Sequence, residues 1–256
     1  MFTDRTALLT QAYADRGPLA ARISIYQWQQ DPVDLPGLAV AALADVRGLV
    51  LDAGCGLGTY AERVRADRPD LNVVALDLSV GMRPDLVGDV QALPLAESSC
   101  SGALAMHMLY HVPDIPAAVR ELRRVLKAGG VLVVSTNGRD DKHELGQLFV
   151  DAVHDLTGTT IEAPRFAGRF TPDDSHLLQA AFDSVEVAVF ERVTLVPQVQ
   201  AVMAYVNSMR ALRSELLPPG LGWEAFLDAV RTRVSAEIGG SGSWRLHNQV
   251  GVLTCR

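Results

Sequence analysis

The segment from Leu49 to Tyr60, LVLDAGCGLGTY, constrains the fold of this chain most strongly. An apolar run ends in an acidic residue, glycines follow at every second position (Gly54, Gly56 and Gly58), and a helical pattern begins directly after them. This order is typical of a parallel strand, a tight loop and a helix N-terminus. Glycines permit positive φ and close approach to the backbone, and a helix N-terminus attracts negative charge. The sequence therefore predicts a loop that binds a partly anionic, nucleotide-like ligand.

Short apolar runs and helical patterns alternate from Gly48 onward. We expect strands at 49–52, 72–77, 102–107 and 130–136, with helices at 59–67 and 117–126. Beyond residue 140 the periodicity is weaker, and the expected elements are helices at 141–156, 173–181, 198–217 and 223–238 and strands at 184–196 and 244–254. Such alternation is typical of an α/β fold, in which helices cover both faces of a parallel sheet.

Composition and charge restrict the partners. The chain has 256 residues, of which 48% are hydrophobic and 21% charged, as in globular proteins. Its net charge is −7 and it has no Lys/Arg cluster, so we expect no nucleic-acid partner. The N-terminal segment is unlike a signal peptide, no apolar run reaches membrane-spanning length, and three scattered cysteines (Cys55, Cys100 and Cys255) form no zinc or disulfide pattern. We expect a cytoplasmic protein with no membrane partner.

The glycine loop by itself leaves two classes of cofactor open. Residues 56–61, GLGTYA, match the alanine variant of the dinucleotide fingerprint. Asp77 follows Gly56 by about twenty residues, the usual spacing of a ribose-binding acid. An NAD(P)-dependent oxidoreductase is therefore one interpretation of these residues.

A longer set of motifs resembles the class I S-adenosylmethionine (SAM)-dependent methyltransferases, especially small-molecule enzymes of bacterial specialised metabolism such as antibiotic biosynthesis. The resemblance is strong over about residues 48–138 and weak over the last strand. It consists of five ordered blocks: DAGCGLG at 52–58, ALDLS at 75–79, GDVQALPL at 88–95, MHMLYHV at 106–112 and LRRVLKAGG at 122–130. Only five residues separate Met82 from Gly88, where relatives have a fuller helix, so we expect that helix to be reduced.

The resemblance implies a Rossmann-like fold with a seven-stranded, mostly parallel sheet and helices on both faces. It also implies an N-terminal helical cap at 1–46 and a SAM-binding methyltransferase domain at 47–256. Within that domain, the helices at 198–240 interrupt the hairpin at the end of the sheet. Insertions at this place commonly form a substrate lid, although a dimer surface or plain core is the alternative.

The resemblance also assigns a SAM site. Asp77 accepts hydrogen bonds from the ribose hydroxyls, Asp89 accepts from the adenine amino group, and Asp52 supports the methionine end through water or the loop. The remaining expected cofactor residues are Gly54, Gly56, Gly58, Leu78, Val90, Met106, Tyr26 and Arg22. Structural alternatives stay open: Asp77 as a strand-end cap, Asp89 as a turn acid, and Arg22 as the partner of a surface acid instead of the methionine carboxylate.

Three polar residues are candidates for catalysis. His107 follows a strand end, where its unperturbed pKa would suit a base or an orienting group near neutral pH. His111 lies four residues on, and we favour a hydrogen bond to the loop for it. Asn137 ends the next strand and is placed to hydrogen-bond a substrate. The histidines lack an accompanying carboxylate in an HExxH pattern, so we expect no metal, and Asp140 and Asp141 are interpreted as a helix start.

Aromatic and methionine side chains form the expected substrate wall, with simple packing as the alternative. They are Tyr26, Trp28, Tyr110, Met203 and Met209. The resulting hypothesis is in-line transfer of a methyl group from SAM to an oxygen, nitrogen or carbon atom of a small aromatic or apolar acceptor, with S-adenosylhomocysteine (SAH) as product. The alternatives are the NAD(P)-dependent oxidoreductase and a catalytically silent SAM-binding partner subunit. The sequence leaves open whether the chain forms a homodimer.

Overall fold

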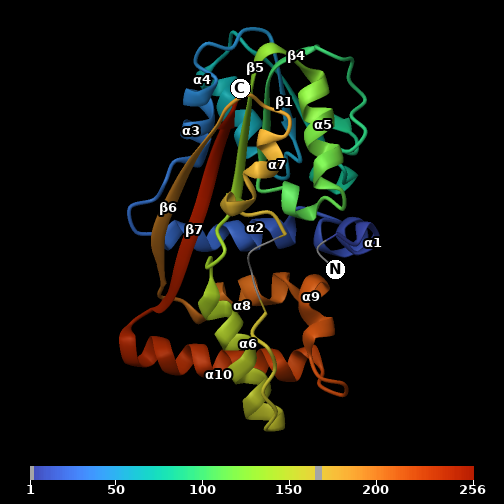
Figure 1. Cartoon of the computed structure of the whole chain (residues 1–256). Coiled ribbons are helices and arrows are strands. Elements are labelled where there is room, and N and C mark those ends of the chain that lie inside the picture. Colours follow the sequence, from blue (N-terminus) through green and yellow to red (C-terminus); the bar gives the residue numbers. More distant parts are fainter. Residues whose placement is uncertain (1–2, 165–168) are drawn as a thin grey trace.

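The structure is a computed structural model that describes residues 3–164 and 169–256 (Figure 1). Within these ranges, seven strands form one sheet in the order β3-β2-β1-β4-β5-β7-β6. Their bounds are β1 Leu49–Ala53, β2 Asn72–Asp77, β3 Leu86–Val87, β4 Cys100–Met106, β5 Leu126–Asn137, β6 Val185–Val196 and β7 Trp244–Cys255. β1 to β5 pair in parallel, whereas β7 is antiparallel to both of its neighbours. The predicted seven-stranded, mostly parallel sheet is confirmed.

Two differences from the expected strands have simple reasons. β3 has only two residues, too few to produce a recognisable pattern. β5 begins at Leu126 instead of residue 130, because Leu126 pairs with Cys100 before an irregularity in the register.

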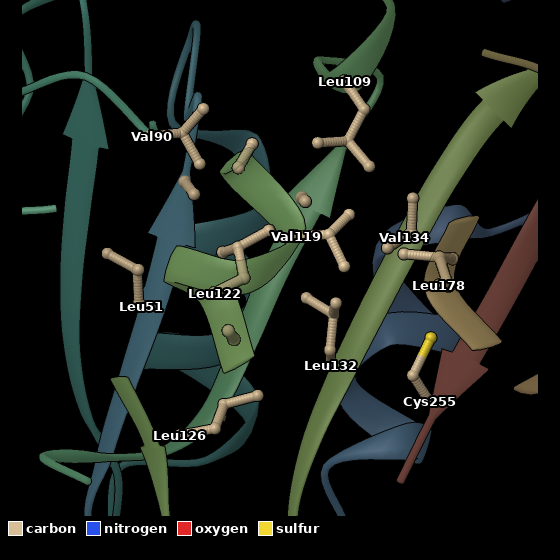
Figure 2. Packing of buried hydrophobic residues seen from close by; sticks show 14 of the residues in the cluster. Leu51, Val90, Leu109, Val119, Leu122, Leu126, Leu132, Val134, Leu178 and Cys255 are labelled. Atoms are coloured by element: carbon tan, nitrogen blue, oxygen red, sulfur yellow. The ribbon is translucent and has the colours of Figure 1, made fainter. Parts of the chain in front are cut away.

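Helices cover both faces of the sheet. α5 (Ile115–Val125) and α7 (His176–Gln179) pack on one face, and α3 (Leu35–Ala42) and α4 (Thr59–Asp67) on the other. The strand residues alternate accordingly: Leu132 and Val134 face α5 and α7, as Figure 2 shows, while Val131 and Val133 face α3 and α4. Because both faces of the sheet are covered by helices, successive residues of a central strand are mostly buried, and the sequences of these strands are continuous apolar runs.

The connection after β2 is short, as the sequence indicated. It holds one turn of 3-10 helix, η3 (Val80–Met82), capped by the Ser79 hydroxyl, which accepts a hydrogen bond from Gly81 N. The turn packs closely under the N-terminal segment: a Cβ at Gly81 would lie 2.1 Å from Ala14 O. The shortened connection therefore leaves room for the N-terminal residues beside the end of β2.

The N-terminal region divides into two parts. The first comprises α1 (Arg5–Ala7), the π-helix η1 (Leu8–Ala12), α2 (Gly17–Ser24) and the 3-10 helix η2 (Ile25–Trp28), and α2 crosses below the sheet in Figure 1. The second part, α3, instead belongs to a layer of the main domain, since Ala39 and Leu43 are buried against sheet residues. Of the segment expected as a cap, residues 1–46, the last helix, α3, therefore packs against the sheet as part of the main domain.

A second group of helices lies beyond the carboxyl ends of the parallel strands (Figure 1). It comprises α6 (His143–Thr157), α8 (Val199–Ser208), α9 (Arg210–Arg213) and α10 (Trp223–Ser241). Their shared core includes Phe149, Trp223 and Phe226, with the two phenylalanine rings 4.5 Å apart. α8 to α10 follow β6 and precede β7, so these helices do interrupt the hairpin. The remaining short elements are the 3-10 helices η4 (Leu109–His111), η5 (Pro172–Asp174) and η6 (Ser214–Leu216).

The β6–β7 hairpin is longer than the sheet that it completes. β7 pairs with β5 only from Val250 to Cys255, whereas it pairs with β6 along its whole length from Trp244. The first half of β7 therefore projects toward the second group of helices. None of the helices in the described ranges is long and apolar enough to cross a membrane.

Candidate functional site

A cavity of about 560 Å³ lies at the carboxyl ends of the strands, a volume typical of small-molecule sites. Its lining comes from the glycine loop, the ends of β2, β4 and β5, the N-terminal helices, α8, α9 and β7. Parallel sheets commonly bind ligands at this edge. The residues predicted for the cofactor and several of those predicted for the substrate meet here.

The glycine loop forms one wall of the cavity. Gly54 and Gly56 both line it and have φ of +70° and +54°, values that side-chain-bearing residues rarely adopt. A Cβ at Gly54 would also lie 2.7 Å from Met108 Cβ. Gly58 does not line the cavity; it is the N-cap of α4, with φ of +83°. The loop therefore exposes backbone to a ligand, as its sequence indicated.

Asp77 occupies the end of β2, and its side chain faces the loop. One oxygen accepts a hydrogen bond from Gly56 N at 3.0 Å and the other from Ser79 N at 2.8 Å. Burial raises the pKa of the carboxyl, and the hydrogen bonds from Ser79 and Gly56 oppose the rise. Asp77 lines the cavity, so a ligand hydroxyl can reach the same carboxylate.

Asp89 lies along the same wall with Leu78 and Val90. Its carboxylate accepts a hydrogen bond from Arg5 at 2.9 Å and contacts the amide of Gln91. The N-terminal segment thus reaches the predicted adenine end of the site. An acid with two apolar neighbours suits an adenine ring that has one amino group to satisfy.

Asp52 is buried beneath the loop and does not line the cavity. Its Oδ2 accepts from Ala61 N at 3.1 Å, while its Oδ1 has no hydrogen-bond partner in the described part of the chain. Burial raises the pKa of this carboxyl to about 7. Asp52 therefore has no direct access to the cavity and contacts the first turn of α4 instead.

Arg22, from α2, is a cation in the cavity wall. Its Nη1 donates to Ser208 O at 3.1 Å, and its guanidinium lies 5.2 Å from the centre of the Tyr13 ring. The buried Nη2 has no partner within residues 3–164 and 169–256. A ligand carboxylate would satisfy this nitrogen, which fits the amino-acid end of SAM. Among the residues that the structure describes, no acid forms an ion pair with Arg22.

The N-terminal segment is fastened to the cofactor motifs by specific hydrogen bonds. The Tyr13 hydroxyl lies 2.7 Å from His111 Nε2, and Ser79 Oγ donates to Tyr13 O at 2.6 Å. Arg16 donates to Leu57 O in the glycine loop. His111 therefore links the N-terminal segment to the strand-end loop, consistent with the hydrogen-bonding role favoured for it.

His107 lines the cavity at the end of β4, but its environment differs from the expected one. Its backbone is left-handed, with φ of +55°, and its N–H donates to Ser135 O at 2.9 Å. Burial, with a smaller contribution from the positive charge of Lys142, lowers the pKa of His107 to about 4. The expectation of an unperturbed pKa is therefore wrong. The imidazole is neutral at physiological pH and is a weak base.

The substrate residues divide between cavity and core. Tyr26, Tyr110 and Met209 line the cavity, as do Met106 and Asn137. Trp28 and Met203 do not, because both pack into the core of the second group of helices.

The side of α8 that faces the cavity explains part of this division. The cavity is lined by Tyr205 and Met209, which are four residues apart and share one helical face. Met203 lies on a different face of the same helix and packs inward. Sequence periodicity identified α8 as amphipathic but did not indicate which face meets a ligand.

Lys142 and Asp141 are two of the cavity residues that the sequence did not indicate. Both line the cavity, both are only 3% exposed, and the Lys142 ammonium forms an ion pair with the Asp141 carboxylate. Burial disfavours the charge of Lys142, but Asp141, Tyr26 and Tyr205 together outweigh it and raise the pKa well above its usual value. Asp141 was interpreted as a helix start, which is incorrect: α6 begins at His143, and the aspartate turns inward.

The tyrosines of the chain gather around the cavity. The chain has five tyrosines, Tyr13, Tyr26, Tyr60, Tyr110 and Tyr205, and every one of them lines the cavity. Burial raises the pKa of each hydroxyl, so all five are neutral donors and acceptors. Chain position alone does not reveal this convergence, because the tyrosines come from five separate segments.

Comparison with known proteins identifies the family. Residues 51–134 match the family described as "Methyltransferase domain". The chain is 38% identical over 112 residues to a malonyl-[acyl-carrier protein] O-methyltransferase of Dechloromonas aromatica, covering 40% of this chain and 41% of that protein. It is 31% identical over 204 residues to the protein of the same name from Pectobacterium atrosepticum, covering 75% and 76%. The first curated relatives are matched over about two fifths of their own length.

A solved structure agrees in fold. Phosphoethanolamine N-methyltransferase 2 of Haemonchus contortus, in complex with SAM, superposes with a TM-score of 0.54 at 15% identity, covering 100% of this chain and 60% of that one. This chain belongs to the class I SAM-dependent methyltransferases, and SAM is the cofactor of the family. The resemblance seen in the five sequence blocks is therefore confirmed. The interpretation of the glycine loop as an NAD(P) site is superseded.

Proposed function

We propose that this protein transfers a methyl group from SAM to a small aromatic or apolar acceptor of the natural-product type. The observation that carries the proposal is a single cavity in which the cofactor motifs and a tyrosine-rich wall share one space. Bound SAM supplies an electrophilic methyl group on a sulfonium, so the protein must bind, orient and exclude water. A catalytically silent SAM-binding subunit would not need the tyrosine-rich wall beside the cofactor motifs.

In this proposal Asp77 accepts from the ribose hydroxyls, and Asp89, with Leu78 and Val90, borders the adenine. The glycine loop and Arg22 hold the methionine end. The geometry supports these roles through the cavity-facing Asp77 carboxylate, the backbone exposed at the glycines and the buried, unsatisfied Nη2 of Arg22.

The acceptor would lie against Tyr26, Tyr110 and Met209, with His107 and Asn137 at the strand ends orienting it. Because its pKa is about 4, His107 is better suited to hydrogen bonding than to removing a proton. The helices at 198–240 contribute Tyr205 and Met209 to this wall, which supports a lid role for them.

Two measurements test the proposal. Thermal unfolding is compared without ligand and with SAH, SAM or NADH in excess, since a ligand of the folded state raises the midpoint. We expect a rise with SAH and SAM alone. A rise with NADH alone would contradict the cofactor assignment.

The second measurement uses SAM with an isotopically labelled methyl group and a panel of phenols, carboxylic acids and amines. Mass spectrometry should detect the label in at least one small acceptor. The names of the two curated relatives specify a malonyl group on an acyl-carrier protein, so a malonylated carrier protein forms a separate arm. Labelling of the carrier alone would replace the small-molecule proposal, and SAH binding without any labelled product would favour the silent subunit.

A further inference from the structure

The buried pair of Lys142 and Asp141 is held rigidly at the overhanging part of β7. Asp141 accepts from Gln249 N at 3.0 Å, and the backbone N–H of Lys142 donates to His247 O at 2.9 Å. The two charges are therefore fixed against a strand that contributes to the cavity wall. Neither residue belongs to the motifs assigned to the cofactor.

Burial of such a pair has a cost that its mutual attraction does not readily offset. Taking two charges out of water costs several kcal/mol per ion, and replacement of such a pair by apolar residues is often neutral or stabilising. Since the pair lines a cavity, a ligand is the natural reason for its presence. The ammonium has three donors, of which Asp141 accepts one.

Aromatic side chains surround the ammonium. Lys142 Nζ lies 5.4 Å from the centre of the Tyr26 ring, and its charge also acts on Tyr205, Tyr110 and His107. These residues belong to the wall proposed for the acceptor. The cation is therefore directed to the acceptor end of the cavity instead of the end that holds Asp77 and Asp89.

A second, independent group at this end lacks a partner. Asn248 lines the cavity, is nearly fully buried, and uses Oδ1 to accept from Thr194 Oγ1 at 2.6 Å and Gln29 Nε2 at 3.4 Å. Its Nδ2 has no hydrogen-bond partner in the part of the chain that the structure describes. A buried amide donor without an acceptor is costly, so a ligand oxygen would relieve it. The residues on either side, His247 and Gln249, bond to Lys142 and Asp141.

We propose that Lys142 and Asn248 bind an ionised oxygen of the acceptor, a phenolate or a carboxylate, at the end of the cavity lined by Tyr26 and Tyr205. The inference rests on the proposed function and specifies the chemistry of its acceptor. A charge-assisted hydrogen bond from the ammonium and a neutral one from the amide would both point to one anion.

This assignment also fits the low pKa of His107, because it requires no strong base beside the acceptor. An oxygen that is already ionised carries its own nucleophilic electron pair and needs no proton removed. The neutral His107 is then a suitable neighbour, because it does not compete for the proton. The aromatic rings of Tyr26 and Tyr205 would contact the body of the acceptor.

The test measures binding of small probes to the SAH complex by calorimetry. The anionic probes are benzoate and para-nitrophenolate, and the neutral probes of similar shape are benzamide and para-nitrotoluene. Wild type is compared with Lys142→Met, with Asp141→Asn/Lys142→Met, which leaves no unpaired carboxylate if the single variant fails to fold, and with Asn248→Ala. The matched control is Lys127→Met, which removes the only other lysine, on the exposed part of β5.

We expect wild type and Lys127→Met to bind an anionic probe more tightly than its neutral counterpart. Loss of the ammonium should weaken anion binding by about tenfold or more and leave neutral probes nearly unchanged. The nitrophenol should also bind as the coloured phenolate below its solution pKa in wild type and Lys127→Met, but not in the variants that lack Lys142. The arm that responds, phenolate or carboxylate, identifies the acceptor oxygen.

Equal affinity for anionic and neutral probes, no effect of Lys142, or no binding of any probe to the SAH complex would overturn the inference. The unfolding midpoint with SAH is measured for every protein. If SAH raises it but the probes do not discriminate, the inference alone fails. If SAH has no effect on wild type, the proposed function fails instead.

Discussion

The two ends of the cavity differ in how the chain supplies them. At the end proposed for the cofactor, Asp77, Leu78, Asp89 and Val90 come from one short stretch that runs from the end of β2 to just beyond β3. At the acceptor end, the lining comes from η2, the β5–α6 connection, α8 and β7, through Tyr26, Lys142, Tyr205 and Asn248.

The difference shows how each end obtains its geometry. The motif end depends mainly on the backbone of two segments, the glycine loop and the end of β2, which the Asp77 carboxylate joins by accepting from Gly56 N and Ser79 N. The acceptor end depends on tertiary packing, because β7 must overhang the sheet to bring Asn248 beside Lys142. Changes at the first end should therefore affect cofactor binding, and changes at the second should affect the choice of acceptor.

The largest effect is expected at Asp77. Asp77→Ala removes two charge-assisted ligand hydrogen bonds and should weaken SAH binding by about a thousandfold, or about 4 kcal/mol. Calorimetric titration of SAH measures the change. Asp67→Ala, an acidic residue at the end of α4 outside the cavity, is the matched control and should bind like wild type. SAH affinity that is unchanged in Asp77→Ala would contradict the placement of the cofactor.

A large effect on stability is expected at Asp52, whose pKa is raised by burial to about 7. Since the unfolded chain releases this proton near pH 4, the group destabilises the ligand-free fold progressively as pH rises from about 4 to about 7. Asp52→Asn should be more stable than wild type by roughly 3 kcal/mol above this range, somewhat less than the full shift implies because the new amide nitrogen is also buried.

Denaturant unfolding at several pH values measures this prediction. The advantage of Asp52→Asn over wild type should be lost below about pH 4, where both states of the wild type are protonated and only the cost of the buried amide remains. A difference that is independent of pH would show that the effect arises from packing instead of ionisation.

A smaller effect is expected for the hydrogen bond that fastens the N-terminal segment. Tyr13→Phe removes the contact between the Tyr13 hydroxyl and His111 Nε2. One neutral hydrogen bond is worth about 1 kcal/mol, so SAH affinity should fall by about fivefold. Thr10→Val removes a bond within the same segment that does not reach the strand ends, and it should leave SAH affinity unchanged. Equal losses in the two variants would argue against a specific fastening.

The smallest effect is expected for pH acting on His107. Because its pKa is lowered to about 4, its charge should not change between about pH 6 and pH 8. NMR of the histidine rings tests this, with the His107 signal assigned by its loss in His107→Asn and with exposed His143→Asn as the assignment control. A His107 signal that titrates near neutral pH would restore the role of general base.

The sequence predicted the sheet, and the motif residues do meet at one end of the cavity, for a physical reason. Gly54, Gly56 and Asp77 have requirements that are local: positive φ, close backbone approach and a strand end. Such requirements restrict the residue types at neighbouring positions, so they can be recognised as short sequence motifs. The apolar alternation that defines β1, β4 and β5 is equally local.

The wall proposed for the acceptor could be predicted only in part. Tyr26, Tyr110 and Met209 do line the cavity, but Trp28 and Met203 pack in the core, and the sequence did not indicate Lys142. Whether a helix residue faces a cavity or a core depends on which helices pack around it, and short-range spacing does not encode this. The inward turn of Lys142 depends on a left-handed backbone, with φ of +57°, that no glycine signalled.

The central claim is that one cavity holds SAM at the motif end and the acceptor beside Lys142. A crystal structure of the protein with SAH and benzoate tests it most directly. We predict the ribose hydroxyls on Asp77, the adenine beside Asp89, and the sulfur directed toward the wall formed by Tyr26, Tyr205 and Lys142, with the benzoate carboxylate on Lys142 and Asn248. SAH bound elsewhere, or with its sulfur directed away from Lys142, would contradict the account.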